Sequence, residues 1–319
     1  MSLGMRQGRL QTDPLPSCNE GPSKAAILCF LQEATTDGDA AFVPPLDRVA
    51  VFDNDGTLCA EKPLYLQGIF ALDRVKTLIA QHPEWREHQP FQSILEGDLA
   101  GVYAGGLKTI LELLVATHGG NTSEEFDQIV LDWIASARHP STGRPDTETV
   151  YQPLLELLDT LQSYGFRNHI DSGGGIESMP AWAEGVYGIP PEQVIGSSNE
   201  TRFEIRDGRP VLVRLPQVDL VHDHEGKPEG IHRFIGRRPL LAGGNSDGDL
   251  QMQQWTAAGD GPRFLGLAHP TDAEREWAYD RESPIGRLDR APDEAQAQGW
   301  TVVDMAREWQ AVYPWEASS

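Results

Sequence analysis

The sequence predicts an α/β protein, with a doubly wound, Rossmann-like parallel sheet and an α-helical cap domain inserted into it. Short apolar runs of the kind that form buried strands alternate with amphipathic helical patterns. Several of these runs end in Asp, Ser, Asn and Gly, at the strand ends where open α/β sheets bind ligands. We divide the chain into a leader (1–22), a core (23–58 and 150–319) and a helical cap (59–149).

The leader is polar, and we expect it to be flexible. Met1–Gly4 before Met5 resemble a cloning remnant. No signal peptide is visible, so we expect a cytoplasmic protein, or a periplasmic one if a signal peptide has been removed. Cys18, Cys29 and Cys59 lack metal-ligand spacing, and their odd number argues against a disulfide framework.

The balance of charge limits the partners of the chain. Its 319 residues hold 26 Lys and Arg against 48 Asp and Glu, a formal charge of −22. Such a surface repels nucleic acid and anionic lipid, and no apolar run is long enough to span a bilayer. An anionic substrate would need a local positive site. The oligomeric state is left open.

The core is expected to begin with a helix over Lys24–Ala34, capped by Ser23, followed by a loop and the strand Val49–Phe52. Four helical patterns then form the cap before a Pro/Gly-rich loop over His139–Asp146. Caps of this kind close over small substrates. The four expected helices span Leu64–Ala80, Gln89–Leu99, Leu107–His118 and Ser123–Ala137.

The second half returns to alternating strands and helices, with a β-hairpin around Asp207-Gly208. The expected helices are Val150–Tyr164, Ile176–Val186, a segment from Lys227 through Ile235, one from Leu250, a charged helical stretch from Thr271, and a final one near Val303–Tyr313. The expected strands are Arg167–Ile170, Phe203–Arg206, Pro210–Arg214, Pro239–Ala242 and, as the last, Arg263–Leu267.

The first acidic strand end, Asp53-Asn54-Asp55-Gly56-Thr57, allows three interpretations. Asp, Asn and Gly are ordinary turn residues. An EF-hand loop fails on spacing, because Gly56 as its sixth residue would place Lys62 at the twelfth. The third interpretation is a phosphoryl-transfer site, in which Asp53 attacks phosphorus, Asp55 handles protons and a hard cation neutralises the phosphate oxygens.

Three further strand ends carry candidate groups. Ser172 precedes three glycines, which suits the binding of an oxyanion. Lys227 follows a loop, and the strand Pro239–Ala242 ends in Gly-Gly-Asn245-Ser-Asp247-Gly-Asp249. His222–Glu225 could bind a metal by residue type, but we interpret it as a solvated turn.

In this order the four motifs resemble the haloacid dehalogenase (HAD) superfamily, in particular its phosphoserine-phosphatase-like branch, over Arg48–Met252. The resemblance implies an aspartyl-phosphate mechanism. Asp53 would be the nucleophile and Asp55 the general acid/base, while Ser172, the Gly173 amide and Lys227 would bind the phosphoryl group. Magnesium would be held by Asp53, the backbone carbonyl of Asp55, Asn245 and Asp249.

Two residues depart from the family pattern. Asn245 stands where the family has Asp, so the metal site loses one negative charge, for which Asp247 could compensate. Asp171 precedes Ser172 where an apolar residue is expected, either as a local capping acid or as a perturbation of the phosphate pocket. The sequence does not choose between these roles.

We therefore expect a magnesium-dependent phosphomonoesterase for a small phosphorylated metabolite. By the same resemblance Glu61 would contact a substrate amine, which suggests a phosphoserine- or amino-alcohol-phosphate-like substrate; an exposed loop acid is the alternative. Two other functions stay open. A dehalogenase would need neither Asp55 nor the second acidic cluster, and Asn245 is compatible with a catalytically weak protein that binds phosphorylated metabolites.

Overall fold

A computed structural model describes residues 13–98, 106–176 and 178–317 of the chain. Its centre is a seven-stranded sheet in the order β4-β3-β2-β1-β5-β6-β7. Every neighbouring pair is parallel except β3 and β4, which form an antiparallel hairpin. This confirms the predicted α/β class. The strands are β1 Val49–Phe52, β2 Arg167–Gly175, β3 Val194–Arg206, β4 Arg209–Leu220, β5 Leu241–Gly244, β6 Phe264–His269 and β7 Thr301–Asp304.

Helices cover both faces of the sheet, because the central strands are apolar on both sides. Ala50 and Phe52 of β1 pack in one cluster with α1 (Pro22–Thr35), α7 (Gln152–Ser163) and α8 (Pro180–Tyr187). Val49 and Val51 pack on the other face with Ile231, which follows α9 (Gly226–Gly230), and with α10 (Leu250–Ala257). Burial of both faces makes the sheet a rigid support for the polar groups at its carboxyl edge.

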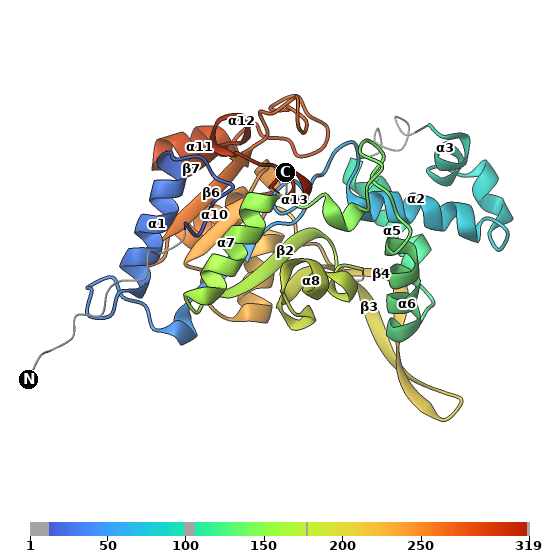
Figure 1. The fold of residues 1–319 in the computed structure, drawn as a ribbon. Helices are drawn as coiled ribbons and strands as arrows, with labels where there is room; N and C mark the ends of the chain where they lie inside the picture. Colours follow the sequence, from blue (N-terminus) through green and yellow to red (C-terminus); the bar gives the residue numbers. More distant parts are fainter. Residues whose placement is uncertain (1–12, 99–105, 177, 318–319) are drawn as a thin grey trace, which may run out of the picture.

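Between β1 and β2 the chain forms the helices that the sequence predicts for the cap. They gather at one end of the molecule (Figure 1) and have a small apolar cluster of their own that includes Val75, Trp85 and Phe91. The described elements are α2 Leu66–Leu78, a 3₁₀ turn Pro83–Glu87, α3 Phe91–Glu96, α5 Gly106–His118 and α6 Ser123–Ile134. Leu99, the expected end of the second helix, lies outside the described residues.

The helical segment leaves and rejoins the core at one place. Ala60 N donates to Thr149 O at 2.9 Å, and Tyr151 N donates to Leu58 O at 2.8 Å. The two connecting segments therefore run side by side. The inserted helices also contact the hairpin. The guanidinium of Arg214 in β4 lies 4.5 Å from the ring centroid of Phe126 in α6.

The β3–β4 hairpin is longer than predicted and projects beyond the rest of the molecule (Figure 1). Its turn is the predicted Asp207-Gly208, with φ of 49° and 75°, as a type I′ turn requires. The prediction covered only the tip, because Gly196–Thr201 of β3 is mostly polar and Pro216 interrupts the pattern of β4.

Several local predictions were wrong. Gly21, not Ser23, precedes α1, because Ser23 Oγ donates to Glu308 instead. Strand β2 continues through the glycines that were expected to follow it, and α8 starts only at Pro180. The expected last helix, Val303–Tyr313, begins within strand β7, is helical only over the one-turn helix α12 (Met305–Glu308) and is irregular after it. Strand β7 follows β6, so β6 is not the last strand. The charged stretch from Thr271 is irregular up to α11 (Ala291–Gln298).

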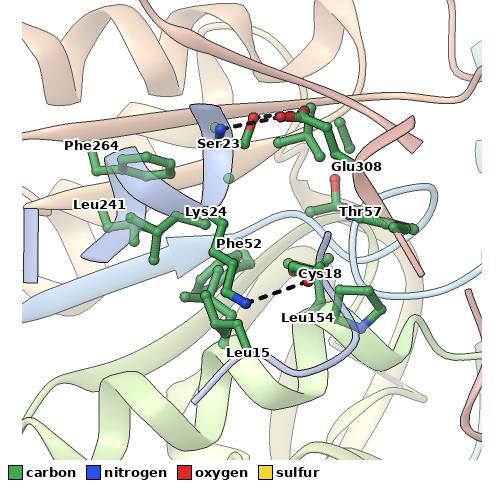
Figure 2. Close-up of a pocket in the computed structure, with 18 of the residues that line it drawn as sticks. Leu15, Cys18, Ser23, Lys24, Phe52, Thr57, Leu154, Leu241, Phe264 and Glu308 are labelled. Carbon is green, nitrogen blue, oxygen red and sulfur yellow. Dashed lines mark hydrogen bonds between the residues drawn. The ribbon is translucent and has the colours of Figure 1, made fainter. Parts of the chain in front are cut away.

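A second region of interest is an apolar cavity of about 60 Å³ beneath the segment that leads into α1 (Figure 2). Leu15, Phe52, Leu241 and Phe264 are among its lining residues. Lys24 lies at its edge and forms ion pairs with Asp13 and Glu20. The surface that lines it is almost entirely apolar, so we do not interpret it as a site for a charged substrate. Among the described residues, no helix combines the length and the hydropathy of a membrane span.

Candidate active site

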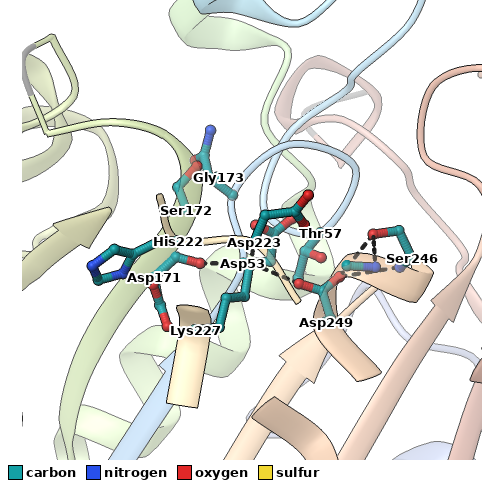
Figure 3. A network of polar contacts seen from close by, with 12 residues as sticks. Asp53, Thr57, Asp171, Ser172, Gly173, His222, Asp223, Lys227, Ser246 and Asp249 are labelled. Carbon is teal, nitrogen blue, oxygen red and sulfur yellow. Dashed lines mark hydrogen bonds and ion pairs between the residues drawn. The ribbon is translucent and has the colours of Figure 1, made fainter. Parts of the chain in front are cut away.

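The candidate site is organised around Lys227, whose side chain is buried (Figure 3). Its Nζ lies 2.6 Å from Oδ1 of Asp53 and 2.6 Å from Oδ1 of Asp249, and it donates to the backbone carbonyl of Asp171 at 2.8 Å. One ammonium group thus joins residues that follow β1 and β5 and a residue within β2. The predicted meeting of Asp53 with Asp249 is present in the structure.

These groups meet because the three strands are in register. Phe52 of β1 pairs with Ile170 of β2 and with Gly243 of β5. The residues that come next along each strand therefore arrive at the same edge of the sheet. Gly226–Gly230 then places Lys227 beneath this edge, since α9 packs against the sheet through its continuation at Ile231.

The loop after β5 uses its two acids differently. Asp249 accepts hydrogen bonds through Oδ2 from the backbone amides of Asn245 and Ser246, at 3.0 and 3.1 Å. Asp247 instead accepts through Oδ1 from the amides of Asp289, Arg290 and Ala291, at 2.8–3.1 Å. Asp247 therefore caps the start of α11, and these contacts do not support the compensating role at the metal site that the sequence left open.

Asp55 and Ser172 lie on the side of the site that faces the inserted helices. A Cβ at Gly174 would lie 3.2 Å from Ser172 Oγ and 3.8 Å from Asp55 Oδ2, so both groups border this glycine. Gln67 of α2 reaches the same loop and accepts from Gly175 N at 2.6 Å. Gly173 is exposed to solvent. A cavity of about 20 Å³ beside Asp55 is lined by residues of α2, α6 and α8.

Asn245 is buried and its amide is oriented from both sides. Thr57 Oγ1 donates to its Oδ1 at 3.0 Å, and its Nδ2 donates to Glu61 Oε1 at 2.8 Å. Glu61 also accepts from Tyr279 OH at 2.5 Å. The Glu61 side chain is 1% exposed. Its contacts are with Asn245 and the loop of Tyr279, and they give no support to the predicted contact with a substrate amine.

Asp171 forms a fully buried pair with His222, with Asp171 Oδ1 2.7 Å from His222 Nδ1. The sequence assigned His222–Glu225 to a solvated turn, which is wrong for His222 and fits His224, which is exposed. The pair explains how a carboxylate can occupy a position where an apolar strand residue was expected. It lies directly behind Lys227, because the Asp171 carbonyl accepts from that lysine.

The pKa values of the central groups follow from burial and from their neighbours. Burial and the nearby Asp249 raise the pKa of Asp53 well above its usual range, while Lys227 opposes the shift. Burial raises the pKa of Asp55 to about 6. Burial alone would lower the pKa of Lys227, but Asp249 and Asp53 outweigh it and raise the pKa. The lysine therefore stays charged, and Asp55 can exchange protons near neutral pH.

The donor atoms around Lys227 fit a hard divalent cation. Asp53, Asp55, Asn245 and Asp249 offer only oxygen ligands, as Mg²⁺ prefers. Three of these residues are acids, and a single lysine cannot balance all three once they are ionised. Within the described part of the chain, Oδ1 of Asp55 is buried without a hydrogen-bond partner. The same part holds no group of three His, Cys, Asp or Glu side chains arranged as a complete metal site, in keeping with an amide at Asn245 and a lysine between Asp53 and Asp249.

Three residues around this site were not predicted there: two were not considered, and His222 was assigned to a solvated turn. Gln67, His222 and Tyr279 touch it from α2, from the end of β4 and from the loop before α11. None of them belongs to a strand-end motif, and each reaches the site through contacts between distant parts of the chain. The buried histidine could have been suspected, because the Asp171 carboxylate needs a partner in a strand interior.

No protein-family model and no curated protein sequence matches the chain. Among solved structures, it is similar to a conserved protein of unknown function from Anaerococcus prevotii, with a TM-score of 0.58 and 15% identity over 92% of this chain and 94% of that chain. A protein of unknown function from Bordetella pertussis has a TM-score of 0.51 and 16% identity over 81% of this chain and 98% of that chain.

A phosphoserine phosphohydrolase-like protein from Francisella tularensis has a TM-score of 0.40 and 14% identity, over 78% of this chain and 98% of that chain. The likeness to the first two structures extends to the fold. Their identities are too low to carry an activity across, so a function for this chain has to be argued from the residues of its own site.

Proposed function

We propose that this chain is a magnesium-dependent phosphomonoesterase of the HAD superfamily, in its phosphoserine-phosphatase-like branch, and that it acts on a small phosphorylated metabolite. The observation that carries the proposal is the buried Lys227 ammonium held between Asp53 and Asp249. Burying such a cluster costs stability. A catalytic site that must bind a phosphate dianion gives a reason for keeping it.

Asp53 is the proposed nucleophile. A carboxylate is nucleophilic at neutral pH once it is ionised, and the adjacent Lys227 favours ionisation. An Asp53 oxygen forms a bond to phosphorus as the bond from phosphorus to the ester oxygen breaks. The product is an aspartyl-phosphate and an alcohol. Lys227, Ser172 and the Gly173 amide would neutralise and orient the phosphoryl oxygens during this step.

Asp55 is the proposed general acid and base. In the first step it gives its proton to the leaving ester oxygen. In the second it takes a proton from water as that water attacks phosphorus, and the bond to Asp53 breaks to release inorganic phosphate. A pKa of about 6 suits a group that must work in both directions.

Magnesium, when bound, would offset the repulsion between the Asp53 carboxylate and the phosphate oxygens. Asp53, the backbone carbonyl of Asp55, and Asn245 are the groups that would hold it. Asp249 would complete the acidic set while its own oxygens hold Lys227 and the loop amides in place.

The inserted helices favour a small substrate. The cavity beside Asp55 has a volume of about 20 Å³, which leaves room for about one water molecule. We infer that α2 and α6 move relative to the core to admit substrate and then exclude bulk water. Polymers would not fit beneath them. Since the Glu61 contacts give no support to an amine-binding role, the choice of phosphoserine- or amino-alcohol-phosphate-like substrates rests on resemblance alone.

Hydrolysis of p-nitrophenyl phosphate with and without magnesium tests the proposal. We expect turnover that is lost on chelation, restored by magnesium and abolished in Asp53→Asn. A screen of small phosphorylated metabolites would then define the substrate. Tight binding of phosphate esters without turnover in the intact protein would instead favour a binding protein, the alternative that Asn245 keeps open.

A further inference from the structure

Glu61 is an acid for which the proposed mechanism has no role, although it is as deeply buried as the nucleophile's partners. It belongs to the segment that enters the inserted helices, and it is 1% exposed. It accepts from Asn245 Nδ2 at 2.8 Å and from Tyr279 OH at 2.5 Å. A buried carboxylate is destabilising unless its surroundings compensate, so its position calls for an explanation.

Two glycines make room for this acid. A Cβ on Gly56 would lie 2.6 Å from Glu61 Oε1 and 2.0 Å from Asn245 Nδ2, and a Cβ on Gly286 would lie 1.8 Å from Glu61 Oε1. Both glycines have positive φ, 82° and 60°, a conformation that disfavours any other residue. The backbone therefore closes around the pair of Asn245 and Glu61 from two separate loops.

The hydrogen bonds also fix which end of the Asn245 amide faces each neighbour. Burial raises the pKa of Glu61, while the Tyr279 hydroxyl and the nearby Lys62 oppose this shift and favour the charged form. An ionised carboxylate only accepts, so the NH₂ group points at Glu61. Thr57 donates to the opposite end, the Oδ1 oxygen, at 3.0 Å. That oxygen has a second lone pair, and it is the atom of Asn245 that would face a cation. Glu61 is thus bonded to the far end of a proposed metal ligand.

We propose that Glu61 supplies the negative charge that Asn245 lacks, so that the two side chains act together as one carboxylate ligand of the metal site. Asn245 provides the oxygen, and Glu61 orients its amide and polarises it through a charge-assisted hydrogen bond. Glu61 is a positioning residue in this scheme and does not touch substrate. The inference rests on the proposed function, because it assumes that a divalent cation binds beside Asn245.

Mn²⁺ binding to the full chain, measured by the electron paramagnetic resonance signal of the free ion, tests this directly. We expect Glu61→Gln to weaken Mn²⁺ binding about 10- to 100-fold, the usual effect of removing a partner of a metal ligand. Glu282→Gln is the matched control, because it removes the same charge from an exposed acid in the loop of Tyr279, and it should leave the affinity unchanged.

The double variant Asn245→Asp/Glu61→Gln exchanges the two groups and keeps the total charge and the hydrogen bond between them. It should bind Mn²⁺ within about threefold of the unmodified protein, far from the 10- to 100-fold loss expected for Glu61→Gln alone. Asn245→Asp alone places two carboxylates at hydrogen-bonding distance, so without metal its melting temperature should lie below that of the double variant. Should Glu61→Gln fail to fold, the double variant decides the matter by itself.

Tyr279→Phe tests whether Mn²⁺ binding depends on the charge of Glu61 or only on the hydrogen bond that holds Glu61 in place. It removes the other hydrogen bond of Glu61 and should lower the melting temperature, but it should weaken Mn²⁺ binding less than Glu61→Gln does, because the carboxylate itself is kept. A Glu61→Gln variant that binds Mn²⁺ as tightly as the parent, while Asp53→Asn binds it more weakly, would overturn the inference and leave the proposed function intact. A folded double variant that does not recover binding would also overturn it. A parent protein that neither binds Mn²⁺ nor hydrolyses p-nitrophenyl phosphate would remove the proposed function and the inference together.

Discussion

The loops after β1 and β5 carry similar residues and differ in how the structure uses them. Each follows a four-residue buried strand, and each has two acids separated by one residue. After β1, Asp53 and Asp55 both border the candidate site. After β5, Asp249 binds Lys227, whereas Asp247 caps α11. Position at a strand end therefore brings an acid to the edge of the sheet, but the backbone that it meets there decides its role.

The strongest test of these different roles is to replace each of the two acids that bind Lys227, Asp53 and Asp249. We expect Asp53→Asn to lower kcat/KM on p-nitrophenyl phosphate by 10⁴-fold or more, on the order of the loss seen when a nucleophile is removed. Asp249→Asn should lower it by only about 10²-fold, because Asp249 positions other groups. Equal losses in the two variants would contradict the assignment of Asp53 as nucleophile.

A second test compares the other acid of each loop. Asp55→Asn removes the proposed acid and base and should lower kcat by about 10³-fold for an ester with a poorly leaving alcohol. The loss should be smaller for p-nitrophenyl phosphate, because nitrophenolate leaves without a proton. Asp247→Asn, which keeps a capping oxygen, should retain full activity. A uniform loss across both esters would argue against a proton-transfer role for Asp55.

The pH dependence of stability extends the test to the metal-free protein. Burial raises the pKa of Asp55 to about 6. It also raises the pKa of Glu276, which accepts from the hydroxyl of the buried Tyr151 at 3.2 Å, to about 7. Both values lie above those of unfolded Asp and Glu. The folded state then binds more protons than the unfolded state, so stability falls as pH rises through these values. We expect the melting temperature in chelator to fall between pH 5 and pH 7.5. Asp55→Asn should flatten part of this fall.

Magnesium should oppose the fall in melting temperature with rising pH, since it binds ionised carboxylates. We therefore expect it to raise the melting temperature more at pH 7.5 than at pH 5, as scanning calorimetry would measure. A metal effect that is the same at both values, or larger at pH 5, would contradict the acidic ligand set.

The smallest expected effect concerns Asp247 alone. Asp247→Ala removes the acceptor for three amides at the start of α11 and should lower the free energy of unfolding by about 1 kcal/mol. Activity at a temperature where the variant is folded should be unchanged. Urea denaturation measures the stability, and hydrolysis of p-nitrophenyl phosphate measures the activity. A catalytic defect without a loss of stability would indicate that Asp247 belongs to the metal site.

The sequence predicted the parts of this molecule that depend on local pattern. Apolar runs located β1 and β5, and the acids that follow them identified the edge where Asp53 and Asp249 meet. The partners of these groups depend on distant contacts. The amides capped by Asp247 lie some forty residues along the chain, and Tyr279 reaches Glu61 from a loop of the same region.

Short elements without a regular pattern also could not be predicted from the sequence. Thr301–Asp304 forms a strand because it pairs with β6, with Val302 opposite Leu267 and Val303 opposite Ala268. From the sequence alone, a helix was expected to begin near Val303, inside this strand. The tertiary partner decided the local conformation, as is common for short strands.

The central claim is that Asp53 forms a covalent bond to phosphorus, and rapid acid quenching during turnover of p-nitrophenyl phosphate tests it most directly. Mass spectrometry of peptides from the quenched protein should find one phosphoryl group on the peptide that contains Asp53, and none in Asp53→Asn. A phosphoryl group on another residue, or steady turnover with an unmodified Asp53 peptide in every quenched sample, would contradict the account.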